Sequence, residues 1–377
     1  MNDDLDLLYT DVEESLRDAV RTLMARRWGP ERGIARYDGD TSDPGLWSAL
    51  SGELGLAGLL VPEEFGGAGA SAREAAVVLE ELGRAMAPVP YLTSAVVAAR
   101  VLVKVADKEL AGEVAGGQVA ALAVPLSAAP DGSAALAPVT VGGDGCLSGE
   151  VRGVAGALDA EVLIVPVTAA TGTQLWAVER AAVRITPVVS LDMTRQLADV
   201  DLAGATGRLL ADGDMAVRAV DEALELGAAL LASEQVGLAQ WCLDTTLDYV
   251  KTRRQFGRVV GGFQALKHRL ADLYVQVETA HAVARYAAVT AAADDPDRAV
   301  AASVAQAYCA DVAVLAAEEC VQMHGGIAMT WEHPAHLYLK RAKADQLVFG
   351  TPGNHLVRLS PLIDLPARGT AGQQTAD

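Results

Sequence analysis

The order of hydrophobic periods along the chain restricts its fold more than any single motif does. Up to about residue 118, apolar residues recur at three- and four-residue intervals, which is the period of an amphipathic helix. From about 119 to 210, short apolar runs such as EVLIVPV and TQLWAV alternate with clusters of Gly, Pro, Asp and Thr, as in a small antiparallel sheet. The helical period returns after Asp214 and persists to about Leu362. The sequence therefore predicts a mainly α fold with a small β-domain between two helical regions.

This order divides the 377 residues into four expected segments. A chain of this length exceeds one ordinary hydrophobic core, so several packed units are expected. We assign an N-terminal helical domain to residues 1–118, a middle β-domain to 119–212, a C-terminal helical bundle to 213–364 and a flexible tail to 365–377. Within the first domain, Ser71 is expected to cap a helix that follows a Gly-rich loop.

The formal net charge of −19 restricts the partners of the chain. Nucleic acids and anionic membranes repel a strongly acidic protein, so neither is expected as a partner. The sequence has no 18-residue uncharged run and no basic, apolar N-terminus, which predicts a soluble, cytoplasmic protein. The four cysteines are far apart and lack metal or disulfide spacing, so we expect reduced core residues at Cys146, Cys242, Cys309 and Cys320.

A local reversal of charge occurs at the cationic cluster, which we define as Lys251, Arg253, Arg254 and Arg258. Such a cluster requires an anionic partner, and the sequence leaves two candidate partners open. One is a solvated network of salt bridges with the chain's many carboxylates. The other is the phosphates of a ligand, for which arginine offers a planar, bidentate donor. Glycines follow at 257 and 261–262, and glycine allows a backbone to approach a bulky ligand.

Motifs for other chemistries are weak or absent in the sequence. His333 and His336 are one helical turn apart beside Glu332, but no second carboxylate stands at matching spacing, so no metal site is predicted. No GxSxG elbow, no P-loop and no GxGxxG after a strand is found.

Four long segments, in order, resemble the acyl-CoA dehydrogenase family, and the resemblance covers nearly the whole chain. These segments are GLAGLLVPEEFGGAG, VVLEELGRAMAPVP, TRRQFGRVVGGFQALKHRLAD and CVQMHGGIAMTWEHPAHLYLKRAKA. The resemblance implies an N-terminal helical domain, a middle β-domain and a C-terminal four-helix bundle, which together enclose FAD and a CoA thioester. It also implies that subunits pair so that each flavin lies across an interface.

The resemblance further implies eight FAD-contacting positions. Arg253 matches an arginine that reaches the FAD pyrophosphate of a neighbouring subunit, and a guanidinium suits a phosphate group. For Gly325 and Gly326, an ordinary helix-connecting turn remains the alternative interpretation. The other seven positions are Gln255 and Phe256 beside Arg253, Gln264, the loop residues Gln322, Gly325 and Gly326 along the adenosine end, and Thr351 near the adenine side.

The sequence departs from the family where the chemistry is done. The family's reaction removes a proton from the α-carbon of the thioester, while hydride leaves the β-carbon for the flavin, so it needs a carboxylate base. At the two positions where members carry that base, this chain has Phe349 and Gly227. Glu225 is turned about 200° from Gly227 on a helix, and Asp345 is a full turn from Phe349. We expect neither to act as the base and assign no catalytic residue.

The β-domain departs from the family as well. Many members end a strand with Thr-Glu-Pro beside the flavin ring, whereas this chain has Ala123, Val124 and Pro125. The tryptophan segment that packs on the isoalloxazine is not recognisable between Leu147 and Val167, and Trp176 lies too far along to replace it. The chain thus has the family's residues at the positions that reach another subunit's FAD, but it lacks the family's residues at the positions around its own flavin ring.

The resemblance therefore implies a base-lacking subunit of a heteromeric acyl-CoA dehydrogenase, of the kind found in actinobacteria for steroid side-chain or other bulky acyl-CoA substrates. We expect a catalytic partner subunit, an α2β2 tetramer with fewer FADs than subunits, and electron-transfer flavoprotein as the electron acceptor. Two alternatives remain. One is a self-sufficient homotetramer that uses Glu225 or an unrecognised base. The other is a non-catalytic acyl-CoA-binding or scaffold protein.

Overall fold

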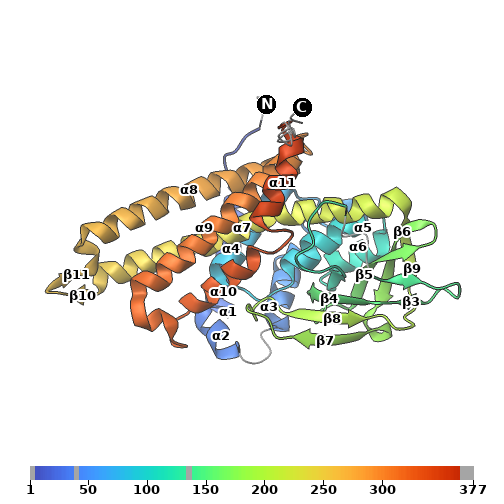
Figure 1. The fold of residues 1–377 in the computed structure, drawn as a ribbon, viewed down its shortest axis with the longest axis horizontal. Coiled ribbons are helices and arrows are strands. Elements are labelled where there is room, and N and C mark those ends of the chain that lie inside the picture. Colours follow the sequence, from blue (N-terminus) through green and yellow to red (C-terminus); the bar gives the residue numbers. More distant parts are fainter. Residues whose placement is uncertain (1–4, 38–41, 133–137, 366–377) are drawn as a thin grey trace, which may run out of the picture.

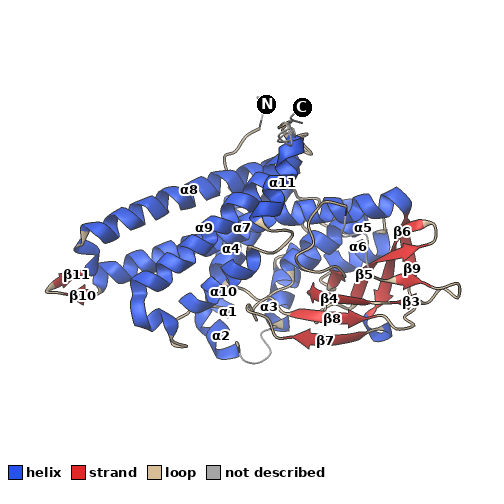
Figure 2. Cartoon of the chain, in the orientation of Figure 1, coloured by secondary structure: helices blue, strands red, loops and turns tan. Residues whose placement is uncertain are grey.

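The computed structural model describes residues 5–37, 42–132 and 138–365. Helices form both ends of the sequence and a small β-region lies between them, which confirms the predicted fold class (Figures 1 and 2). The β-region lies at one end of the elongated molecule, and the small β10–β11 hairpin lies at the other (Figure 1). Of the predicted tail, all but Leu365 lies outside the described residues.

The N-terminal helices begin at side chains that satisfy free backbone N–H groups. Thr10 and Glu13 form a capping box at the start of the first helix, and Ser71 and Glu74 form another, so the predicted cap at Ser71 is confirmed. The helical elements in this region are α1 (Asp11–Arg27), α2 (Pro30–Arg36), α3 (Pro44–Ser48), η1 (Ala49–Glu53), η2 (Leu56–Gly58), η3 (Glu63–Phe65), α4 (Ala72–Ala85), η4 (Tyr91–Ala98), α5 (Ala99–Lys104) and α6 (Lys108–Ala115).

The β-region consists of two sheets. The larger sheet has the order β3-β2-β5-β6-β9, with β1 pairing parallel to β5, and the smaller has the order β4-β8-β7. The core strand β5 is buried along six consecutive residues, as its continuous apolar run requires. The strands are β1 (Ala120–Leu122), β2 (Thr140–Val141), β3 (Leu147–Ser148), β4 (Glu150–Ala155), β5 (Val162–Ala169), β6 (Gly172–Glu179), β7 (Arg184–Val188), β8 (Leu197–Asp201) and β9 (Arg208–Asp212), with the short helix η6 (Arg180–Ala182) before β7.

One 40-residue helix, α7 (Gly213–Thr252), runs from the β-region to the far end of the molecule (Figure 1). It packs against α4, α8 and α9 and is the common wall of the core. The remaining elements are β10 (Arg254–Gln255), β11 (Arg258–Val259), η7 (Val260–Gly262), α8 (Gln264–Ala292), α9 (Arg298–His324), η8 (Gly325–Met329), α10 (Ala335–Asp345) and α11 (Pro352–Leu362).

Helices α4 and α7 cross at two glycines. A Cβ atom on Gly83 would lie 2.2 Å from the carbonyl oxygen of Glu234, and one on Gly237 would lie 1.9 Å from that of Glu80. Any side chain at either glycine would therefore push the helices apart, because buried helix contacts have no spare volume. This close approach holds the N-terminal helices on the C-terminal bundle.

Cys242, Cys309 and Cys320 are buried thiols, as predicted, but Cys146 is only half-buried because it lies at the turn between β2 and β3. The segment Arg298–Met329 is long and apolar enough to span a membrane by length and composition. Within the fold, 61% of its apolar window is buried, which is the property of a helix in a protein core.

Candidate functional site

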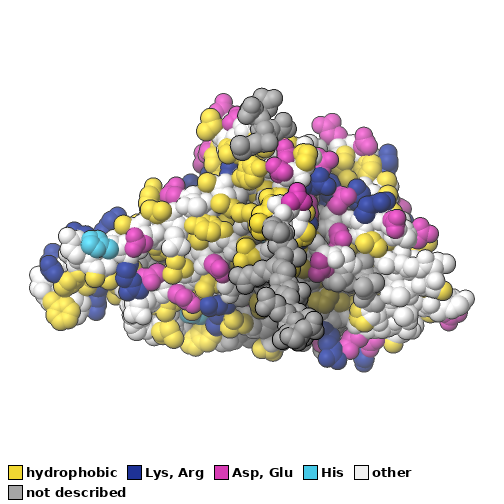
Figure 3. Space-filling view, turned by 45° about the horizontal axis from the view of Figure 1, so that its top comes forward, with side chains coloured by type: hydrophobic (Ala, Val, Ile, Leu, Met, Phe, Trp, Pro, Cys, Tyr) yellow, Lys and Arg dark blue, Asp and Glu magenta, His cyan; other side chains and the backbone are white. Residues whose placement is uncertain are grey.

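The cationic cluster lies where α7 stops, at the end of the molecule opposite the β-region. We call this end, which includes the β10–β11 hairpin, the open end. Arg253 is the first residue after the helix, and the β10–β11 hairpin follows, turning at Phe256 (φ +52°) and Gly257 (φ +76°). Phe256 is 90% exposed, and its ring meets that of Phe263 edge-on at 6.2 Å. Lys and Arg side chains gather over this end in the space-filling view (Figure 3).

The four cations of the cluster are exposed, and none forms an ion pair with any residue that the structure describes. Elsewhere arginines commonly pair with carboxylates, as Arg84 does with Asp244 at 2.8 Å. The salt-bridge network considered from the sequence is therefore not formed within the described chain. The cluster leaves its donors free for an anion that the described part of the chain does not supply.

A second loop lies close to the cluster. Helix α9 ends at His324, whose ring stacks on Tyr249 in the last turn of α7, with ring centroids 4.4 Å apart. Gly325 follows with φ +66° and ψ −143°, a backbone conformation that favours glycine. A Cβ on Gly326 would meet no atom within 4 Å, and Gln322 is exposed one turn earlier. Together with Gln264 at the start of α8, seven of the eight predicted positions thus belong to this open end.

The eighth position, Thr351, lies in a different region. Thr351 caps α11 through a capping box with Asn354 and directly follows Phe349 and Gly350. Phe349 packs on Gly227 near the middle of α7, and the 25 residues from there to Thr252 correspond to about 38 Å of helix. The predicted positions therefore form two separate groups on this chain.

The region around Phe349, which we call the closed centre, joins both positions where the family carries its base. A Cβ on Gly227 would lie 2.8 Å from Cε2 and 3.0 Å from Cζ of the Phe349 ring. Phe349 is 3% exposed, and its backbone N–H donates to the carbonyl of Leu126 at 3.0 Å. The phenyl ring thus fills the space into which a carboxylate would project from either position.

A small apolar cavity lies beside Phe349. Its volume is about 20 Å³, which is room for about one water molecule. Val124, Pro125 and Ala155 contribute to it, and no described residue that lines it carries a charge. A flavin ring does not fit this space, and the polar edge of the ring would have no charged partner there. Trp176 bonds instead to Gln174 on β6.

Neither alternative carboxylate is free to act at the closed centre. Glu225 pairs with Arg358 and, at 3.4 Å, with Arg298, so it faces a separate cavity of about 490 Å³ on another side of α7. The 200° separation expected from the sequence is consistent with this arrangement. Asp345 belongs to a buried ionic network, and among the described residues it does not line the cavity at Phe349.

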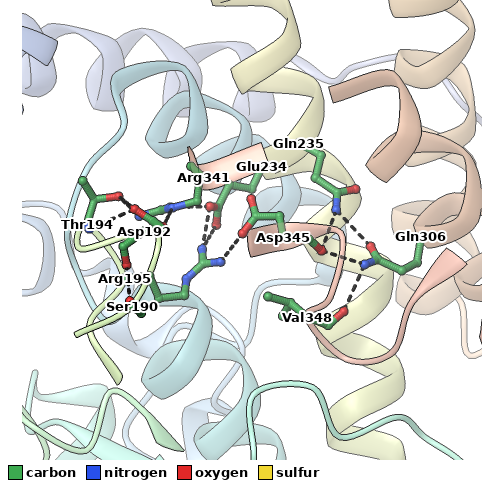
Figure 4. A network of polar contacts seen from close by, with 10 residues as sticks. All are labelled: Ser190, Asp192, Thr194, Arg195, Glu234, Gln235, Gln306, Arg341, Asp345 and Val348. Atoms are coloured by element: carbon green, nitrogen blue, oxygen red, sulfur yellow. Dashed lines mark hydrogen bonds and ion pairs between the residues drawn. The ribbon is translucent and has the colours of Figure 1, made fainter. Parts of the chain in front are cut away.

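This ionic network joins the loop between β7 and β8 to the helices (Figure 4). The Arg195 guanidinium donates to Asp345 at 2.5 Å and to both carboxylate oxygens of Glu234 at 2.5 and 2.6 Å. Arg341 donates to Asp192, to Glu234 at 2.6 Å and to the Thr194 hydroxyl at 2.6 Å. Guanidinium forks that meet carboxylates from several elements fix these elements in one arrangement.

Three carboxylates face two guanidinium groups in this network, so full ionisation would leave one buried negative charge. Burial raises the pKa of Asp345 to about 7, although Arg195 lowers it. The Asp345 atom Oδ2 has no hydrogen-bond partner among the described residues, while its backbone carbonyl accepts from Gln306 at 3.1 Å. Asp345 is therefore the member that takes up a proton near neutral pH.

Sequence reasoning missed this network, because its members are up to 150 residues apart. One signal was available. Glu234 is the single charged residue between Gly227 and Gln240, in an apolar helical run, and a charge in such a run must be paired when buried. No group of three or more His, Cys, Asp or Glu that could hold a metal occurs within the described part of the chain.

Comparison with known proteins gives the family. Models of the acyl-CoA dehydrogenase N-terminal and C-terminal domains match residues 10–114 and 217–358. Acyl-CoA dehydrogenase IpdE2 of Mycolicibacterium smegmatis is 37% identical over 351 residues, which cover 93% of this chain and 98% of that protein. The chain therefore resembles a known acyl-CoA dehydrogenase over almost its whole length.

Two solved structures extend the comparison. A chain of the ChsE4–ChsE5 complex from Mycobacterium tuberculosis is 28% identical with a TM-score of 0.82, covering 96% of this chain and all of that chain. A chain from a variant of the Tcur3481–Tcur3483 steroid ACAD is 30% identical with a TM-score of 0.81, covering 94% and 98%. By domains, sequence and fold, this chain belongs to the acyl-CoA dehydrogenase family.

Proposed function

We propose that this chain is the base-lacking subunit of a heteromeric acyl-CoA dehydrogenase and completes the FAD site of a catalytic partner subunit. The observation that carries the proposal is the packing of Phe349 on Gly227, which removes both base positions and leaves a cavity of about 20 Å³. The exposed, unpaired cationic cluster supports the second half of the proposal. In this proposal, the chain retains exposed cations for a neighbour's cofactor and has no carboxylate at its own two base positions.

The residues at the open end have distinct roles in this proposal. The Arg253 guanidinium binds the FAD pyrophosphate of the partner through paired N–H donors. Gln255 and Gln264 offer amide groups for hydrogen bonds, and the exposed Phe256 ring offers an apolar face. The open space around Gly326 allows backbone to approach the adenosine end. The flavin, when bound, supplies the hydride acceptor, and the partner supplies the base.

The relatives support a two-chain assembly and a bulky substrate. Both of the solved structures above are named for two different proteins, and one is named as a steroid ACAD. We infer an α2β2 tetramer that dehydrogenates a steroid or other bulky acyl-CoA thioester and passes electrons to electron-transfer flavoprotein. Because each closed centre removes one flavin site, such a tetramer holds fewer FADs than subunits.

A self-sufficient homomeric enzyme is the second candidate, and one observation favours it. A general base works best when its pKa is close to the working pH, and the pKa of Asp345 is raised to about 7. Against this, Arg195 holds the Asp345 carboxylate at 2.5 Å within the buried network. Asp345 would have to leave that network to reach a substrate.

The deciding experiment measures bound flavin by visible absorbance. The chain is purified alone, together with a candidate catalytic acyl-CoA dehydrogenase subunit from the same genome, and as Arg253→Ala in the same pair. We expect no flavin alone, bound flavin and activity in the wild-type pair, and loss of flavin with Arg253→Ala. Arg152→Ala, an exposed arginine of the β-region, is the control and should keep both. A yellow, active chain on its own would refute the proposal.

A further inference from the structure

Two buried cysteines meet between helices α7 and α9. Cys242 lies on α7, Cys320 lies on α9, and both are fully buried in the same apolar core. The two helices pack against each other, and the Cys242 thiol hydrogen-bonds to the sulfur of Cys320. The fold therefore makes a pair of neighbouring thiols out of two cysteines that are far apart in the sequence.

An imidazole adjoins this thiol pair. His324 lies one helical turn after Cys320, and its Nδ1 atom is 2.7 Å from the Cys320 carbonyl oxygen and 3.6 Å from the Cys320 sulfur. A carbonyl oxygen can only accept a hydrogen bond, so Nδ1 carries a proton, and the same N–H lies beside the sulfur. The stack of the His324 ring on Tyr249 holds the imidazole in this position.

These contacts give the two thiols opposite acidities. The hydrogen bond from Cys242 lowers the pKa of the Cys320 thiol, burial opposes this effect, and His324 lowers the pKa further. Burial raises the pKa of the Cys242 thiol, and its hydrogen bond to Cys320 raises that pKa further. The pair therefore keeps a proton on Cys242 and favours the thiolate on Cys320, which is the reactive form of a cysteine.

Helix α9 also carries a cysteine for comparison. Cys309 is 1% exposed, and its thiol donates to the backbone carbonyl of Ala280 at 3.5 Å. Burial raises the pKa of the Cys309 thiol, and no neighbouring group lowers it. Cys309 therefore matches Cys320 in helix and burial but lacks the contacts that favour a thiolate.

The positions of the two cysteines along α9 differ as well. Cys320 lies in the last turns of the helix, which ends at His324 and is followed by the exposed Gly325 and Gly326. Cys309 lies in the middle of the same helix. Helix ends open locally at a lower free energy than the middle of a buried helix does, so a small oxidant reaches Cys320 more readily.

We propose that Cys320 and Cys242 are a redox-active thiol pair, which hydrogen peroxide converts to a disulfide between α9 and α7. The Cys320 thiolate attacks one peroxide oxygen, the O–O bond breaks, and the leaving hydroxide takes up a proton to form water. This step leaves a sulfenic acid on Cys320. The Cys242 sulfur then attacks the sulfenic sulfur, the S–O bond breaks, and the hydroxide leaves as water with the Cys242 proton. The two thiols together lose two electrons, and the peroxide is reduced to two molecules of water.

The inference goes beyond the proposed function and does not depend on it, because it concerns thiols of this chain alone. Cys320 lies one turn before the loop at Gly325. A disulfide would therefore tie the last turns of α9 covalently to α7, directly behind that loop.

The test is peptide mapping by mass spectrometry. The full chain is treated with hydrogen peroxide, and the remaining thiols are then alkylated. We expect a Cys242–Cys320 disulfide that dithiothreitol reverses and that forms at least about 10-fold faster than Cys309 is oxidised. In Cys242→Ser, Cys320 should stop at a sulfenic acid, which dimedone traps. In Cys320→Ser, Cys242 should stay unmodified. Cys309→Ser is the matched control and should form the disulfide at the wild-type rate.

Three outcomes would overturn the inference. In the first, Cys242 and Cys320 stay reduced while the half-buried Cys146 is oxidised. In the second, Cys309 reacts as fast as Cys320, which would assign the reactivity to unfolding of the chain. In the third, Cys320 forms a disulfide with a cysteine other than Cys242. Thermal melting checks the folding of each variant, and the map of the wild-type chain decides the inference even where a variant does not fold.

Discussion

The interior of the molecule and the open end use their charged groups in opposite ways. In the interior, the buried network holds Arg195 and Arg341 between three carboxylates, and at the closed centre Phe349 packs on Gly227. At the open end, the cations of the cluster have no ion-pair partners among the described residues, and a Cβ on Gly326 would meet no atom within 4 Å. The contrast teaches that one chain can combine a filled, internally paired interior with exposed cations that have no ion-pair partner among the described residues. The same contrast makes quantitative predictions.

The largest effect is expected from restoring a carboxylate at the closed centre. Gly227→Glu should cost about 5 kcal/mol, because the new side chain collides with Phe349 and its charge is buried without a partner. Phe349→Ala alone should cost about 3–5 kcal/mol. The double variant should be more stable than the sum of the two predicts by at least about 1 kcal/mol, measured by urea unfolding. Additive costs would mean that the two positions do not share one space.

Removing one arginine should lower the free energy of unfolding strongly in the buried network and very little at the open end. Arg341→Met should cost about 3–5 kcal/mol, because it leaves Asp192 and Glu234 without one of their buried partners. Arg253→Ala at the open end should stay within about 0.5 kcal/mol of wild type. Both are measured by chemical denaturation under the same conditions. A similar cost for the two variants would remove the distinction between the regions.

The buried network also predicts a dependence on pH. The folded pKa of Asp345 is raised to about 7, so the folded state binds more protons than the unfolded state between about pH 4 and 7. The contribution of Asp345 to stability is therefore full below this range and is lost as pH rises through 7, by roughly 2–3 kcal/mol from pH 5 to 8. Asp345→Asn should flatten this slope. An unchanged slope in the variant would assign the titration to another group.

The smallest effect is expected at the glycine pair. Gly326→Ala should change stability by less than about 0.5 kcal/mol, because the added methyl group meets no atom within 4 Å. Gly325→Ala should cost about 1–3 kcal/mol through its backbone conformation. If Gly326 serves a bound cofactor, its alanine variant lowers flavin content in the two-chain complex despite unchanged melting. Unchanged flavin content would support the ordinary turn considered from the sequence.

The sequence was sufficient for the fold class and for the local elements with strong signals. The switch from helical to strand periods corresponds to the strands between Ala120 and Asp212, and the cap at Ser71 is found where the sequence places it. The FAD-contacting roles of Arg253 and Thr351 stay predictions. Their division between two distant regions could not be predicted from motif spacing, because it depends on the length of an uninterrupted helix.

The contacts of the closed centre could not be predicted either. Phe349 and Gly227 were each recognisable as lacking a carboxylate, but their mutual contact joins positions 122 residues apart in sequence. The same holds for Arg195 with Asp345, whose pairing depends on how the β-region packs on the helices. Local patterns report which groups must be buried or paired, and long-range packing decides with which partner.

The number of residues in helix α7 also sets the direction in which the β10–β11 hairpin points. Each residue turns an α-helix by about 100° and lengthens it by about 1.5 Å. One residue inserted between Gly237 and Tyr249 would therefore shift the hairpin only slightly along the axis but would aim it in a new direction around it. Insertions of about seven or eleven residues would nearly restore that direction. The residue count of α7 is therefore a constraint separate from its side-chain contacts, because the count determines where the hairpin points.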